Sequence, residues 1–136
     1  MDIQLSDIWT AAGVLIGFQV TSFAWRVSRE VEIGENSDLT WLPPADILNL
    51  ISLLIASIGV FALPISGLAD LNIIKLSFGL AVLLFVRYAF ALAGHYDMYN
   101  NRTRRSKLYF PFQERIVIII VTILAIAYII LAVIPR

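Results

Sequence analysis

The chain has 136 residues, of which 60% are hydrophobic and only 15% are charged, and its ten basic and ten acidic residues leave no net charge. Soluble domains are on average about 25% charged and about 45–50% apolar, so this composition is typical of a membrane protein and argues against a soluble one. The sequence contains no cysteine, which excludes disulfides, thiolate metal sites and cysteine nucleophiles.

Four blocks of 18 to 22 mostly apolar residues follow one another along the chain, at residues 8–25, 47–65, 73–94 and 116–134. A bilayer hydrocarbon core is about 30 Å thick and is crossed by roughly 20 helical residues, so each block predicts a transmembrane helix. The blocks take up more than half of the sequence and leave no separate soluble domain of about 50 residues. We therefore expect an all-α integral membrane protein in which residues 1–136 form one compact bundle of four transmembrane helices.

The first block contains a stripe of small side chains that predicts helix packing. Gly13 and Gly17 have the GxxxG spacing, and Thr10, Thr21 and Ala24 continue the stripe. Small residues let another helix backbone approach closely, which is how helices gain contacts in lipid. Packing within the chain is the simpler interpretation, and contact with a second copy is the alternative.

The connection at residues 26–46 begins with basic residues, continues with acidic ones and ends with residues typical of a helix start. Arg26 and Arg29 open it, and residues 26–32 predict a helical extension of the first span that Gly34 could end. Acidic residues follow, and Pro43, Pro44 and Asp46 then predict the start of the second helix, because proline and an anion both suit a helix N-terminus.

Arg87 lies deep inside the third block, by helical rise about 10 Å from the end of that block. An arginine at the bilayer centre costs about 2.5–3.5 kcal/mol on insertion scales, so its presence needs a reason. Its side chain either snorkels to the interface or lies on an ion pathway or an intersubunit contact. Since no block contains an acidic residue, Gln19 of the first block is the candidate polar partner within the membrane.

The connection at residues 95–115 carries the single histidine, His95, which could sense pH but without cysteine or clustered carboxylates predicts no metal site. It also carries a basic patch that anionic lipid headgroups would attract, made of Arg102, Arg104, Arg105 and Lys107. So short a run does not indicate nucleic-acid binding. The fourth block has nine isoleucines among its 19 residues and no glycine, which predicts an outer helix facing lipid.

The distribution of basic residues predicts the topology. Near the span ends, seven Lys and Arg residues belong to the connections 26–46 and 95–115, whereas two lie on the opposite side. The positive-inside rule then places both connections in the cytoplasm and both termini outside, in the plasma membrane (the inner membrane of a bacterium).

No nucleophile, base and metal ligand occur together in a recognisable motif, so we expect neither an enzyme nor a cofactor. One remaining class is a homo-oligomeric pore or membrane effector subunit, whose partners are the lipid bilayer and further copies of the chain. The alternative is a membrane anchor or sensor subunit that binds a soluble cytoplasmic partner through its basic and acidic connections.

Overall fold

The computed structural model describes residues 4–37, 42–96, 98–99 and 110–134. Every regular element in these ranges is helical: α1 (Leu5–Ser37), α2 (Pro44–Ile55), the π-helical segment η1 (Ala56–Ala62), α3 (Leu63–Ile65), α4 (Leu71–His95) and α5 (Phe112–Val133). Since α2, η1 and α3 follow without a break, they form one long helix. The described chain thus contains four helices long and apolar enough to cross a membrane, as expected.

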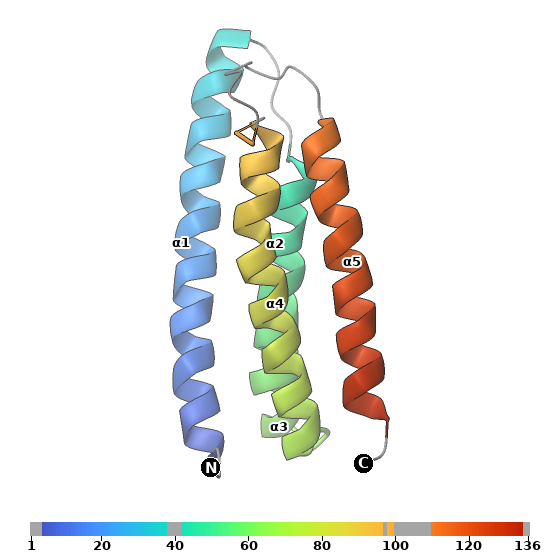
Figure 1. The fold of residues 1–136 in the computed structure, drawn as a ribbon. Helices are drawn as coiled ribbons and strands as arrows, with labels where there is room; N and C mark the ends of the chain where they lie inside the picture. The colour runs from blue at the N-terminus through green and yellow to red at the C-terminus, as the bar shows by residue number, and fades with distance from the viewer. Residues whose placement is uncertain (1–3, 38–41, 97, 100–109, 135–136) are drawn as a thin grey trace.

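The four helices form an up-down-up-down bundle in which each runs antiparallel to the one before it (Figure 1). α2 and α4 lie in the middle, and α1 and α5 flank them on opposite sides (Figure 1). The end of the bundle where α2 and α5 begin and α4 ends is called the Asp46 end below. Leu5 and Val133 lie near the opposite end.

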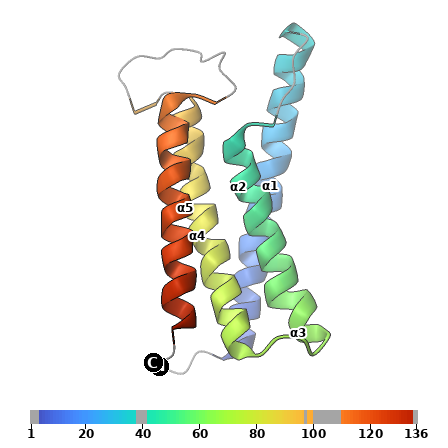
Figure 2. The same cartoon turned by 90° about the vertical axis from the view of Figure 1, so that its right-hand side faces the viewer.

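α1 is longer than the first apolar block and differs most from the expected boundaries. Its 33 residues span about 50 Å and continue through much of the connection 26–46. An ion pair between Arg26 and Glu30, one helical turn apart, supports this extension. Figure 2 shows that the last turns of α1 project past the start of α2.

Two apolar clusters form the core. One joins α2, α4 and α5 near the Asp46 end and includes Leu48, Leu84 and Val121. The other joins α1, η1 and α4 near the opposite end and consists of Ile8, Ala12, Val60 and Ile74. Only Glu114 and Val121 of α5 are buried, so α5 packs mainly on α4 and turns most of its isoleucines outward.

Close backbone approaches explain several small residues. A methyl group on Gly59 would lie 2.3 Å from Ser77 Oγ, and one on Gly94 would lie 3.0 Å from the backbone nitrogen of Glu114. Pro64 has no N–H to donate to the carbonyl of Val60, four residues before it. The indole N–H of Trp9 donates to that carbonyl from α1, at 3.0 Å.

Candidate functional site

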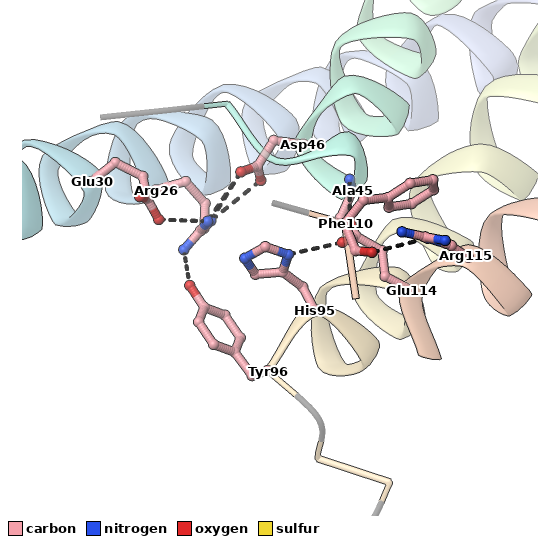
Figure 3. Close-up of polar contacts among 9 residues, drawn as sticks. All are labelled: Arg26, Glu30, Ala45, Asp46, His95, Tyr96, Phe110, Glu114 and Arg115. Atoms are coloured by element: carbon pink, nitrogen blue, oxygen red, sulfur yellow. Dashed lines mark hydrogen bonds and ion pairs between the residues drawn. The ribbon is translucent and has the colours of Figure 1, made fainter. Parts of the chain in front are cut away.

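The first polar cluster is centred on Arg26, which is only 6% exposed. Its Nε donates to both carboxylate oxygens of Asp46, at 3.3 and 3.2 Å, and its Nη2 donates to Asp46 at 3.1 Å and to Glu30 at 2.9 Å. Its Nη1 contacts the hydroxyl group of Tyr96 (Figure 3). The Arg29 guanidinium lies 4.5 Å from the centre of the Tyr96 ring. Arg26 therefore ties α1 to the start of α2 and the end of α4.

The second cluster joins α2, α4 and α5 around the fully buried Glu114. Its Oε2 lies 2.8 Å from Nδ1 of His95, and its Oε1 accepts a hydrogen bond of 2.6 Å from the backbone N–H of Ala45 (Figure 3). The first N–H groups of a helix have no partner within the helix, and Pro43 at the N-cap of α2 offers no capping side chain. Glu114 therefore caps α2 from another helix.

A third set of polar contacts runs deeper into the bundle, between α1, α2 and α4. The Nε2 group of Gln19 donates to Ser52 Oγ, which in turn donates to the carbonyl of Ala81 at 2.6 Å. The Nδ2 group of Asn49 donates to the backbone carbonyl of Gln19 at 3.1 Å. The side chains of Gln19, Asn49 and Ser52 are fully buried.

Two acceptors in this third set have no partner among the described residues, namely Gln19 Oε1 and Asn49 Oδ1. A buried acceptor without a hydrogen bond costs about 1–3 kcal/mol. We call these two atoms the orphan oxygens.

The structure separates Gln19 from Arg87, the two residues considered for a polar pathway. Gln19 lies inside the bundle on Ser52. Arg87 is half-buried on α4 and forms no hydrogen bond or ion pair within the described part of the chain. Snorkelling and an intersubunit role both remain compatible with this placement.

Gly13 and Gly17 lie on the outward face of α1, and a methyl group on either would meet nothing within 4 Å. The described residues therefore show no contact within the chain at these two glycines, and packing of the stripe against another helix stays a prediction. The basic patch at Arg102–Lys107 lies outside them.

Sequence reasoning missed Asp46 and Glu114 as partners of Arg26 and His95. Arg26, Asp46 and His95 are considered there only one by one, as the start of a connection, a helix-entry anion and a candidate pH sensor. The available signal was that both anions begin helices at the end of the bundle where Arg26 and His95 lie.

We compared the chain with protein-family models, curated proteins and solved structures, and none of these comparisons gave a match. Within the described ranges, no group of three or more histidine, cysteine, aspartate or glutamate residues could hold a metal ion. Among the described residues at the Asp46 end, Arg26 is paired with Glu30, Asp46 and Tyr96, and Glu114 with His95 and Ala45, an arrangement suited to holding the four helices together.

Proposed function

We propose that the protein is a multi-pass membrane protein that associates with further copies of itself through α1, as a non-enzymatic pore or effector subunit. The observation that carries this proposal is the outward face of α1. Seven exposed residues on it alternate at spacings of three and four, and we call them the α1 seam: Thr10, Gly13, Gly17, Val20, Ala24, Val27 and Val31.

An alternation of three and four residues is the 3.5-residue repeat by which two helices wrap around each other. Gly13 and Gly17 would let a second backbone approach closely within the membrane, where small residues favour helix contact. Val27 and Val31 continue the seam into the extension, where burial of apolar surface from water would add to the association.

A second copy of the chain suits the whole length of this seam. Copies inserted with the same orientation run parallel, so the membrane part and the extension of one α1 face those of the other. A soluble protein could cover only Val27 and Val31, and lipid could cover only the part around Gly13 and Gly17.

The orientation we propose places the Asp46 end in the cytoplasm, in the plasma membrane. Support comes from the basic residues of the two connections at that end, which outnumber those at the other end by seven to two.

Cysteine cross-linking tests the association directly, because the chain has no cysteine of its own. Single variants Gly17→Cys and Val27→Cys in nanodiscs or membranes are expected to form disulfide-linked dimers on oxidation. Phe18→Cys, which is exposed on α1 but lies off the seam, is the matched control. Equal cross-linking at all three positions, or none at any, would refute the proposed interface.

Whether the assembly conducts ions is a separate question, for which Arg87 is the residue to change. A half-buried cation that has no hydrogen bond or ion pair among the described residues would favour anions if it lined a constriction between copies. Chloride and potassium flux in proteoliposomes should then change in selectivity or disappear in Arg87→Leu. Absence of flux from well-folded wild type would favour an effector without a pore.

The second candidate is a membrane anchor or sensor for a soluble partner. The last turns of α1, which project past α2 and expose Val31 and Glu35, support this candidate (Figure 2). A monomeric wild type in bilayers, together with loss of partner binding in Val31→Glu, would favour it over self-association.

A further inference from the structure

The hydrogen bonds around Gln19 determine which of its side-chain atoms has no hydrogen-bond partner. The carbonyl of Ala81 can only accept, so the hydroxyl of Ser52 must donate its proton there. Ser52 Oγ can then only accept from Gln19, which requires the Nε2 group of the amide. Gln19 Oε1 is therefore the orphan oxygen by necessity, and turning the amide over would remove an existing bond.

The same reasoning holds for Asn49. Its contact is the backbone carbonyl of Gln19, which has no proton to give, so the amide must present Nδ2 to it. Asn49 Oδ1 is left over. Asn49 and Ser52 are three residues apart in α2, so the two amides lie within one helical turn of each other along the α1–α2 contact.

The chemistry of these side chains indicates what the orphan oxygens would take. The one proton of Ser52 is donated and each amide directs one of its two N–H groups at an acceptor, whereas the two orphan oxygens have no partner and can only accept. Amide and hydroxyl oxygens are ligands of hard cations. The nearby carboxylate, Asp46, is one turn from Asn49 and is engaged by Arg26, which disfavours a divalent ion.

We propose that Gln19, Asn49 and Ser52 form a binding site for a small monovalent metal cation, of the sodium or potassium class, inside each protomer. Toward the Asp46 end, the next polar contact between α1 and α2 is the buried ion pair of Arg26 and Asp46. In the other direction the apolar cluster of Ile8, Ala12, Val60 and Ile74 closes it. The site lies within one chain and does not depend on self-association.

The test is the thermal unfolding midpoint of the purified protein in detergent, in sodium, potassium, lithium or N-methyl-D-glucamine chloride at equal ionic strength. A ligand that binds only the folded state raises the midpoint in a saturable manner. We expect at least one metal cation to do so and the organic cation to have no such effect. Identical midpoints in all four salts would overturn the proposal and would assign the orphan oxygens to buried water.

Single substitutions test whether the cation that raises the unfolding midpoint binds at these side chains. Asn49→Ala and Gln19→Leu should abolish the cation dependence, whereas Asn72→Ala, an exposed asparagine of α4, should keep it. If the first two variants do not fold, Asn49→Asp adds a carboxylate at the same place and should shift saturation to lower cation concentration. A cation dependence that Asn49→Asp leaves unchanged would place the ion elsewhere and refute the site.

Discussion

Glu114 of α5 and Ala45 of α2 are joined by a hydrogen bond of 2.6 Å although 69 residues separate them in sequence. Through this bond a carboxylate of the outermost helix caps a central helix, and its other oxygen contacts His95 of α4. Besides Glu114, α5 buries only Val121, so among the described residues Glu114 provides the buried polar attachment of α5 to α2 and α4.

Glu114→Ala should therefore lower the free energy of unfolding by about 1–3 kcal/mol, because it leaves a buried N–H group and a buried imidazole without their partner. Glu114→Gln keeps an acceptor for Ala45 and should lower it less. Thermal or denaturant unfolding in detergent measures both. Thr122→Ala is the control, since Thr122 is exposed and bonds only within α5. If Glu114→Ala were as stable as this control, the cap would not contribute to stability.

Arg26 and Asp46 should behave as a coupled pair. Removing one partner of a buried ion pair typically costs about 3–5 kcal/mol, since the other charge stays buried without compensation. Arg26→Met and Asp46→Asn should each reduce the free energy of unfolding strongly, and the double variant should lose less than the sum of the two. Additive losses in this double-mutant cycle would show that the two side chains act independently.

The sequence alone predicts the four helices and the outward position of α5, because both follow from the length and composition of the apolar blocks. It could not decide which face of α1 turns inward. The face that carries Gln19 and Arg26 turns inward, and the small-residue stripe does not, because these two side chains find hydrogen-bonding partners there. Such pairings depend on the three-dimensional arrangement of residues far apart in sequence, and so does the donation of Trp9 to η1.

Two glycines should respond in opposite ways to the same substitution. Gly94→Ala would bring a methyl group to 3.0 Å from the backbone of Glu114, which cannot move aside as a flexible side chain can. We expect a loss of about 1–3 kcal/mol, as for other overpacked contacts. Gly13→Ala meets nothing within 4 Å and should leave the protomer unchanged or slightly more stable. Unfolding of both variants under monomeric conditions checks this, and equal effects would contradict the close approach of α4 and α5.

The charges beside the α1 seam give the sharpest test of a parallel α1 pair. In two parallel helices with this repeat, a residue that directly precedes a seam position faces, on the partner helix, the residue whose number is five higher. Glu30 precedes Val31 of the seam, so it lies opposite Glu35 of the second copy. The Arg26–Glu30 ion pair of each chain weakens this repulsion but does not remove it. Glu35→Lys should replace the repulsion by attraction and strengthen self-association, most clearly at low salt, because surface charges are screened over about 10 Å at 0.1 M salt. Dimer fraction against protein-to-lipid ratio in nanodiscs or vesicles measures the change. Glu32→Lys, with the same change of charge at a position that does not face Glu30 of the second copy in this repeat, is the matched control. An equal gain in both variants would show that net charge, and not the parallel seam, controls the association.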